Sequence, residues 1–546
     1  MGPSSSPCAS CGRSSRVDII GCHLPPCPLG DDARCNPCID LILLEERILD
    51  TKKVLDGLIE EHRAFRSKLN EVHDPLFKKL PPELVSRVFI ACLPENKNNP
   101  NEAGYLDPLP LSLPIRRSST PLLLASICEI WRQLAFATPQ LWSSIFIQLK
   151  PENVQYQTKV VERWLGRSGG VPLSLHIVYR EWRPGNVHAT SIDSFIPIID
   201  LLNQHSDRWQ DLDLALPHPL ISRLGRNSQA ATRLNTIRVA LHRDAPVGTH
   251  LFPITDVLPV PTVVDIMGLP FSSANVSWRS VTSVKFGWID VGECLALFQQ
   301  APQMTSCAIE FLQDAPAGFV TLPQHLVHRH LHSLTIDTSS PASMGPLCYS
   351  LILPSLKELV YGPYGRLESL HSLVARSSCP LTKLNLTLNG ACTPTNLADF
   401  LHQTPMLESL SFGPIRLNDD LLGLFANTAP ATDAQDEREN IFLPHLQELA
   451  IRQCRRLFSW ASIPKLFPLA SDIGNFPLKS LTLDISGDYD PAIDDGESAN
   501  RILDLIDGGV NIAIKGINRD LIQEARRHYG RPAVPLEDKI DGFRKR

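Results

Sequence analysis

Near the start of the chain, mostly apolar residues recur at alternating spacings of three and four positions. This stripe consists of Leu41, Leu44, Ile48, Thr51, Leu55, Leu58, His62, Phe65, Leu69 and Val72. The spacing is that of the a and d positions of heptads and predicts one long, coiled-coil-like helix over 39–73. Two interpretations stay open, because polar members interrupt the stripe: it joins two copies of the chain, or the helix folds back on its own protein.

Two further helical segments follow, separated by a polar insert at 95–120. In the first, Leu80-Pro81-Pro82-Glu83-Leu84 predicts a helix that begins at its prolines, with an acidic residue in the first turn. In the second, apolar side chains recur at helical spacing until Thr138-Pro139 ends the pattern. These side chains are Leu124, Ile127, Cys128, Trp131, Leu134 and Ala135.

The rest of the chain repeats the phrase L-x-x-L-x-φ, in which φ is apolar. Ten copies begin at Trp209, Leu234, Val281, Met304, Leu331, Leu356, Leu381, Leu407, Leu446 and Leu478. Between positions 281 and 407 the copies start roughly 25 residues apart, a period typical of leucine-rich repeats. Because one such unit cannot bury its own strand and helix, neighbouring units must stack. The sequence therefore predicts a degenerate leucine-rich-repeat-like solenoid with parallel strands.

The two helical segments together resemble the F-box. The opening L-P-x-E-L-x-x-x-V-F is present at 80–89, and the second half of the motif at 127–135 includes Trp131 and Leu134. The following stretch, from Ala135 to Ser144, is similar to F-box proteins of the basidiomycete fungal type. The resemblance implies an α/β chain in which a helical F-box, preceded by a long helix, leads into the repeats.

The same resemblance implies docking on the Skp adaptor of an SCF ubiquitin ligase. The residues that it implies as adaptor contacts are Pro75, Leu76, Leu80, Pro81, Leu84, Val88 and Phe89. Trp131, Leu134 and Trp142 are implied as packing residues of the F-box. The alternative is that these side chains are core positions of an unrelated helical hairpin.

Composition narrows the class of protein. The 546 residues carry a net charge of −6, which does not favour a nucleic-acid binder. No apolar run reaches the roughly twenty residues of a membrane span, and the first residues lack the apolar core of a secretory signal. We therefore expect a cytoplasmic or nuclear protein whose cysteines are reduced or metal-bound.

Six of the 14 cysteines lie in the leader at 1–38. Cys8/Cys11 and Cys35/Cys38 form two C-x-x-C pairs, each able to supply half of a tetrahedral zinc site. Either these four residues hold a structural zinc ion, or the leader binds no metal. No other cofactor is expected.

The sequence offers no catalytic motif of the phosphate-binding, hydrolase or metalloprotease types. His325, His328, His330 and His332 form a local group that is typical of scattered surface histidines, because no other ligand completes a site. An acidic group near 484–495 does not fit a calcium loop. We therefore expect a protein that is not an enzyme.

These patterns predict five parts: a leader (1–38), a coiled-coil-like helix (39–73), an F-box-like domain (74–150), a solenoid (151–514) and a charged tail (515–546). The resulting hypothesis is a substrate receptor that holds the adaptor with its F-box and an unknown target protein with its solenoid. The alternative is a coiled-coil and repeat scaffold that never joins a ligase. Self-association through 41–72 is compatible with both.

Overall fold

The computed structural model describes most of the chain after the leader. The described residues are 35–73, 77, 79–94, 112–179, 192–226, 231–241, 250–252, 257–315, 325–338, 340–363, 365–387, 393–426, 442–467, 478–486, 492–517 and 519–531. They divide into two compact units, and the division falls between Leu141 and Trp142, ahead of the expected boundary at 150.

The first unit is helical. It contains α1 (Asn36–His73), α3 (Pro82–Ala91), α4 (Ser112–Ala125) from Arg116 onward, and α5 (Glu129–Phe136). Helix α1 covers the range that the heptad spacing predicts. Helix α3 begins directly after Pro81, whose extended backbone (φ −66°, ψ 155°) stands before the first helical turn, and Glu83 lies in that turn. The proline-rich start therefore acts as the sequence indicates.

The second unit is built on one large sheet. Among the described residues, sixteen strands join it, and all pair in parallel except β17 with β18. The strands along the sheet are β1 (Ser144–Gln148), β2 (Leu173–Val178), β3 (Trp209–Ala215), β4 (Thr236–Ala240), β5 (Val263–Met267), β6 (Ser283–Gly287), β7 (Ser306–Leu312), β9 (Ser333–Thr338), β11 (Glu358–Tyr361), β12 (Lys383–Thr387), β13 (Ser409–Gly413), β15 (Glu448–Leu457), β16 (Ser480–Ile485), β17 (Asn511–Gly516) and β18 (Arg519–Asp520), while β14 (Arg416–Asn418) pairs with β15 beside this path. The predicted α/β class with parallel strands is confirmed at this level.

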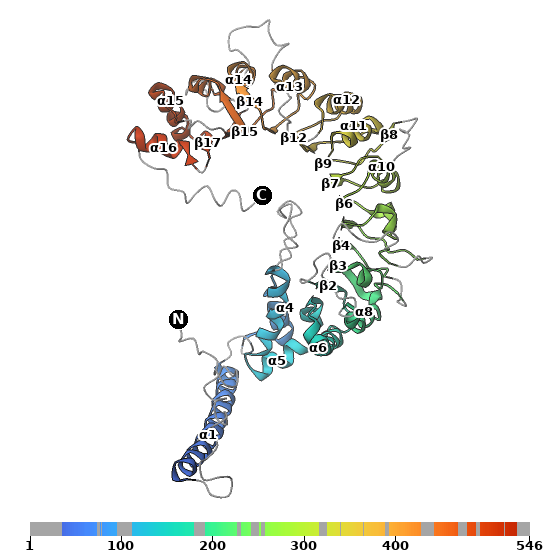
Figure 1. Ribbon diagram of the computed structural model, residues 1–546, viewed down its shortest axis with the longest axis vertical. Helices are drawn as coiled ribbons and strands as arrows, with labels where there is room; N and C mark the ends of the chain where they lie inside the picture. Colours follow the sequence, from blue (N-terminus) through green and yellow to red (C-terminus); the bar gives the residue numbers. More distant parts are fainter. Residues whose placement is uncertain are drawn as a thin grey trace. The chain divides into compact units, whose positions relative to one another are not determined.

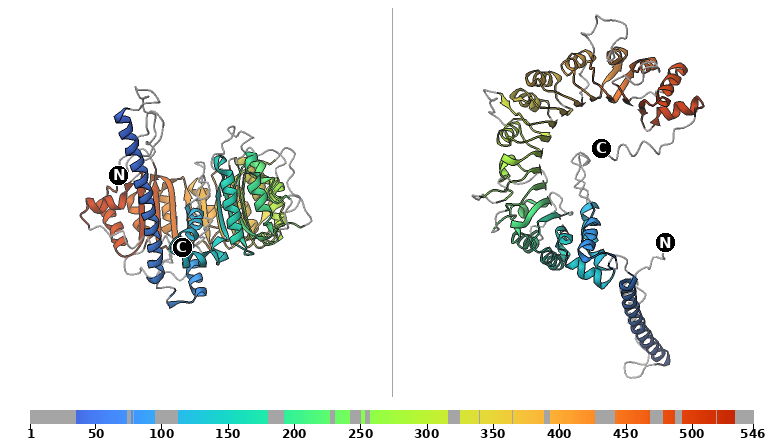
Figure 2. Two further views of the ribbon diagram at one scale, coloured as in Figure 1. Left: turned by 90° about the horizontal axis from the view of Figure 1, so that it is seen from below. Right: turned by 180° about the vertical axis from the view of Figure 1, so that it is seen from behind.

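Helices cover one face of this sheet. They are α6 (Val154–Arg167), α8 (Ile196–Asn203), α9 (His218–Ile221), α10 (Val291–Gln300), α11 (Pro341–Ser350), α12 (Leu367–Ser377), α13 (Pro394–Leu401), α14 (Asp419–Ala426), α15 (Gly496–Asp507) and α16 (Leu521–His528). Within this unit the strands line the inner side of an arc and the helices its outer side (Figure 1), and Figure 2 shows the same two layers from other directions. A separate pair, β8 (Leu326–Val327) with β10 (Leu351–Ile352), lies outside the main sheet.

The phrase L-x-x-L-x-φ produces this layering. Its second and third apolar residues are buried in every predicted copy, as in Leu384 and Leu386 of β12. Because side chains alternate across a strand, both point to the helical layer and the residue between them points to the other side. Several outer helices begin with a side-chain cap: Asp290 accepts a hydrogen bond from the Glu293 amide at 2.9 Å, and Ser340, Thr393, Asp495 and Asp520 cap four others.

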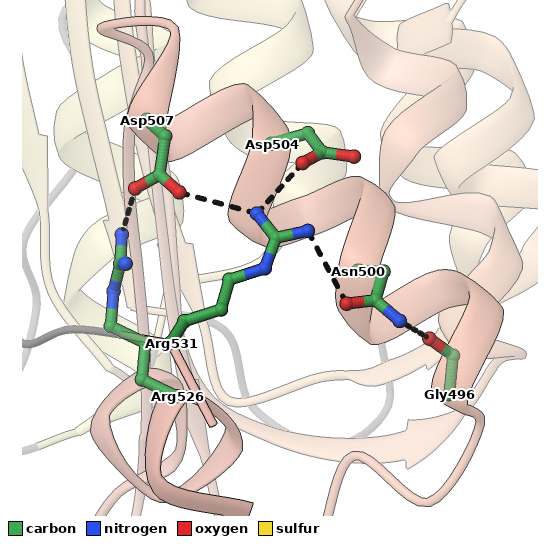
Figure 3. A network of polar contacts seen from close by, with 6 residues as sticks. All are labelled: Gly496, Asn500, Asp504, Asp507, Arg526 and Arg531. Carbon is green, nitrogen blue, oxygen red and sulfur yellow. Dashed lines mark hydrogen bonds and ion pairs between the residues drawn. The ribbon is translucent and has the colours of Figure 1, made fainter. Parts of the chain in front are cut away.

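The sheet continues into the predicted tail. Strand β17 pairs with β16, and helix α16 follows it, so residues 515–531 complete the end of the arc. In Figure 3, Asp507 at the end of α15 contacts both Arg526 of α16 and Arg531, and Arg531 also reaches Asp504 and Asn500. Of the expected tail, residue 518 and residues 532–546 lie outside the described residues.

No helix in the described part of the chain is both long enough and apolar enough to cross a membrane.

Candidate docking surfaces

The helical unit has a small packed core. Val85 and Phe89 of α3 and Ala135 of α5 are all 0% exposed. The ring of Phe89 lies 4.8 Å from that of Trp131, with the two planes tilted by 45°. Helices α3 and α5 therefore pack through an aromatic pair, which agrees with a packing role for Trp131. Leu134 is half-buried in the same helix.

Polar contacts fix the ends of these helices. The Thr138 hydroxyl lies 3.2 Å from the Ser86 hydroxyl and donates to the Leu134 carbonyl at 2.7 Å. The Arg132 Nε donates to the Ala125 carbonyl at 2.9 Å and so links α5 to the end of α4. Because the turn around Thr138 is tied to α3, the Thr-Pro pair ends α5 at a defined place.

Helix α3 presents a second apolar row on its exposed side. Leu84 is 42% exposed and Val88 is 37% exposed, and the two are one helical turn apart. Pro81, just before them, is exposed, and Leu80 is half-buried. We call Leu80, Pro81, Leu84 and Val88 the α3 row. The structure thus brings together four of the seven expected adaptor contacts.

The other three expected contacts are not on this row. Pro75 and Leu76 lie outside the described residues. Phe89 is a correction: its side chain is fully buried against Trp131 and belongs to the core of the unit. Val85 and Phe89 form a row adjacent to Leu84 and Val88, and both rows are apolar, so the sequence does not distinguish the inside from the outside.

Trp142 lies in the second unit. It immediately precedes β1, is 0% exposed, and its ring is 4.8 Å from that of Trp164 in α6. The guanidinium of Arg167 stands 4.5 Å from the centre of the Trp142 ring. Trp142, Ile145 and Ile147 have the spacing of a repeat phrase, which explains why this tryptophan packs with the sheet and its first helix.

Most of the stripe on α1 is uncovered. The exposed fractions are 51% for Leu44, 57% for Leu58 and 63% for Phe65. Near its end, the Asn70 side-chain amide donates to the Ile127 carbonyl at 2.9 Å and ties α1 to the turn before α5. Within the described part of the helical unit, most of the stripe is therefore exposed to solvent.

The inner face of the sheet forms the largest candidate surface. One residue per strand, the one between the two buried apolar positions, stands in register with its neighbours along the sheet. This inner row is Phe146, His176, Asp213, Arg238, Asp265, Lys285, Ala308, Thr335, Val360, Asn385, Ser411, Ala450, Thr482 and Ala513.

The first part of the inner row, on β2 to β6, alternates acidic and basic or imidazole side chains. His176 Nδ1 lies 3.1 Å from Asp213 Oδ2, and Lys285 Nζ lies 2.9 Å from Glu310 Oε1 on β7. Between these pairs, burial raises the pKa of Asp265 to about 6, although Lys285 and Arg238 oppose the shift. These charges are largely compensated by one another within the sheet.

From β7 onward the inner row carries no formal charge. Its members on β7 to β17 are alanine, valine, threonine, serine and asparagine. Charged side chains two positions away on the same strands, such as Glu358 and Lys383, which pair at 2.8 Å, flank this uncharged row on the same face of the sheet. The repeat phrase by itself does not predict this division of the inner row into a charged and an uncharged part. Aligning the central x of L-x-x-L-x-φ would have revealed it.

The cysteine and histidine expectations have separate outcomes. Cys35 and Cys38 lie with their sulfurs 3.3 Å apart at the start of α1, whereas Cys8 and Cys11 lie outside the described residues, so the zinc site stays a prediction. Within the described ranges, no group of three or more His, Cys, Asp or Glu side chains could hold a metal ion. His328 is a correction, since it is buried and its Nε2 lies 3.0 Å from the Ala301 carbonyl.

Several cysteines of the second unit are poor nucleophiles. Burial raises the pKa of the Cys307, Cys348 and Cys454 thiols to about 12. A thiolate, rather than a thiol, attacks a carbonyl or a thioester. These three side chains therefore stay protonated and serve as small apolar groups between sheet and helices.

Comparison of the chain with protein-family models finds no matching family, and a search of curated proteins finds no matching relative.

Proposed function

We propose that this protein is a non-catalytic substrate receptor of an SCF-type ubiquitin ligase. Its helical unit docks on the Skp adaptor and its leucine-rich-repeat-like sheet holds a target protein. The observation that carries the proposal is the exposed α3 row. The Phe89–Trp131 pair packs on the buried side of the same helix. An apolar helix surface of this kind suits a groove on a partner protein.

The proposal also accounts for how a non-catalytic receptor contributes to a reaction. Other subunits carry the ubiquitin, and this chain holds the acceptor lysine of the target near them. Holding two reactants together raises their effective concentration. The uncharged part of the inner row, from Ala308 to Ala513, is the surface that we assign to the target.

Adaptor capture tests the proposal. The full-length chain is expected to capture the Skp adaptor, and Leu84→Asp with Val88→Asp is expected to abolish capture, because the two charges would be buried at the contact. A matched control is Leu457→Asp in β15, where the native side chain is 61% exposed in the other unit. Equal capture by all three proteins, or no capture by the folded wild type, would contradict the proposal.

The second candidate function is a scaffold that is not assembled into a ligase. The exposed stripe on α1 favours it, because a long uncovered helix face is suited to self-assembly. A scaffold predicts that the chain associates with itself but does not capture the adaptor, so the same experiment separates the two functions.

A further inference from the structure

Helix α1 exposes much apolar surface along its length. Its 38 residues extend over about 57 Å at 1.5 Å per residue. Apolar side chains in both halves are more than half exposed: Leu44 (51%), Leu55 (55%), Leu58 (57%), Phe65 (63%) and Leu69 (55%). Single helices in proteins are stabilised chiefly by packing of their apolar face, so α1 requires a partner.

Two ion pairs on α1 lie away from this stripe. Lys53 pairs with Asp50 at 3.1 Å, and Arg63 pairs with Glu60 at 2.5 Å. In the heptad frame set by Leu41 as a and Leu44 as d, these four residues occupy b, c or f positions. The ionic face and the apolar face of the helix are therefore distinct, and both are exposed to solvent along most of the helix.

We propose that the partner is α1 of a second copy, running antiparallel, with the two-fold axis passing between Asp56 and Gly57. In this register, each a residue of one copy faces a d residue of the other copy, and the two residue numbers in every such layer add up to 113. The layers are Leu41 with Val72, Leu44 with Leu69, Ile48 with Phe65, Thr51 with His62 and Leu55 with Leu58.

This register matches the irregular members of the stripe. The two polar members, Thr51 and His62, share a layer, where an imidazole N–H can donate to the threonine oxygen. Thr51 Oγ1 already donates to the Arg47 carbonyl at 2.7 Å, so its lone pairs are the groups that remain for His62. The largest side chain, Phe65, meets Ile48 rather than a second phenylalanine.

Flanking charges favour the same direction. In a parallel pair, Asp40 would face Glu45 of the other copy and Arg47 would face Lys52, against the attractive pairing of Glu61 with Arg66, and symmetry repeats each of these three contacts. In the antiparallel pair Glu45 faces Arg66, and the remaining like-charge pairing is Arg47 with Lys68. The apolar pairing of Val54 with Ile59 is the feature that favours the parallel form, which has one more like-charge contact per copy than the antiparallel form.

The attachment of α1 distinguishes the two directions by the separation of the units. The helix is tied to the rest of its unit near its C-terminal end, through Asn70 and the Ile127 carbonyl. Antiparallel pairing separates these two ends by about the length of the stripe, which is roughly 46 Å for the 31 steps from Leu41 to Val72. A parallel pair would bring both units to the same end. The dimer does not depend on adaptor binding, so the two proposals can fail separately.

Sedimentation of the full-length protein tests the dimer. Wild type is expected to sediment as a dimer at micromolar concentration, and Leu55→Asp with Leu58→Asp is expected to raise its dissociation constant at least about a hundredfold. The matched control is Lys53→Asp with Ser67→Asp, which introduces the same two aspartates on the outer face and should leave the dimer intact. A monomeric wild type, or equal weakening by both variants, would overturn the proposal.

The direction of helix pairing is tested with an Arg66→Lys variant and a carbodiimide, which couples a carboxylate to a nearby lysine amine. Labelled and unlabelled copies are mixed, so that peptides joined between two copies are identified by their mass. The antiparallel register predicts a bond between Glu45 and the new lysine of the other copy. A bond between Glu61 and that lysine would show a parallel pair and overturn the register, as would the absence of any bond between copies.

Discussion

Neighbouring apolar residues of α3 differ in whether their side chains are buried in the core or exposed to solvent. Leu84 and Phe89 are both apolar, yet Leu84 is 42% exposed and Phe89 is fully buried against Trp131. The sequence predicts the helix and both rows, but not which row faces Trp131, because that depends on how α3 crosses α5. A substitution at Phe89 is therefore expected to act on folding, and one at Leu84 on the proposed adaptor contact.

Phe89→Ala is expected to destabilise the helical unit by about 3 to 5 kcal/mol, because it leaves a cavity beside Trp131. Leu84→Ala, on the exposed row, should cost less than about 1 kcal/mol. Hydrogen exchange of the amides in 82–91 of the full-length protein measures both. Equal loss of protection in the two variants would contradict the assignment of Phe89 to the core.

Asp265 gives the second unit a defined pH dependence. Its pKa is about 6 in the folded chain, raised by burial above the ordinary value of 3.8. The folded state therefore binds this proton more tightly than the unfolded state does. The contribution of Asp265 to stability is largest below about pH 4 and falls as the pH rises through 6.

The expected difference across this window is about 2 kcal/mol, from a shift of roughly two pKa units moderated by partial exposure. Urea unfolding at several pH values, for wild type and Asp265→Asn, measures it. The Asn variant should lose this part of the pH dependence. Parallel curves for the two proteins would show that the carboxylate is ordinary. The lysine, arginine and acidic neighbours stay in both proteins and serve as the internal reference.

At the scale of elements, the repeat phrase predicts strands well where all three apolar positions are filled. The copies at Leu381 and Leu407 become β12 and β13. Strands β5 and β17 were not predicted, because Pro261 and Gly509 stand where the phrase expects its first apolar residue. The sheet tolerates these residues because the other two positions, such as Val264 and Ile266, are still buried.

The end of the sheet depends on a different kind of contact. Hydrogen bonds from Arg526 and Arg531 lower the pKa of Asp507. The same bonds join α16, which contains Arg526, and Arg531 shortly after it to the end of α15. Aspartates and basic residues separated by about twenty positions gave no sequence pattern, so this closure was not foreseen beyond the expectation of a tail or cap.

Asp507→Asn is therefore expected to loosen α16 locally. Limited proteolysis should cut within 519–531 faster in this variant than in wild type, and the difference should shrink in high salt, which screens the native contacts. Asp494→Asn, outside the network drawn in Figure 3, is the matched control. Equal cleavage of all three proteins would mean that the arginine contacts do not hold the last helix.

At the scale of the molecule, the surfaces proposed for binding lie on two separate units. The helical unit carries the α3 row and the exposed face of α1, and the sheet unit carries the inner row. Composition and repeats predicted this order of parts. They did not locate the boundary after Leu141, because Trp142 fits both the F-box ending and the first position of a repeat phrase.

The central claim is that the α3 row docks on the Skp adaptor, and calorimetric titration of the purified full-length protein with adaptor at several temperatures tests it most directly. The proposal predicts saturable 1:1 binding per chain with a negative heat-capacity change, the mark of buried apolar surface, and loss of the signal in Leu84→Asp with Val88→Asp. Protection of the α3 and α5 amides from hydrogen exchange shows that the wild type is folded. If such a folded wild type binds no adaptor at any temperature, the claim is contradicted and the scaffold is the function to pursue.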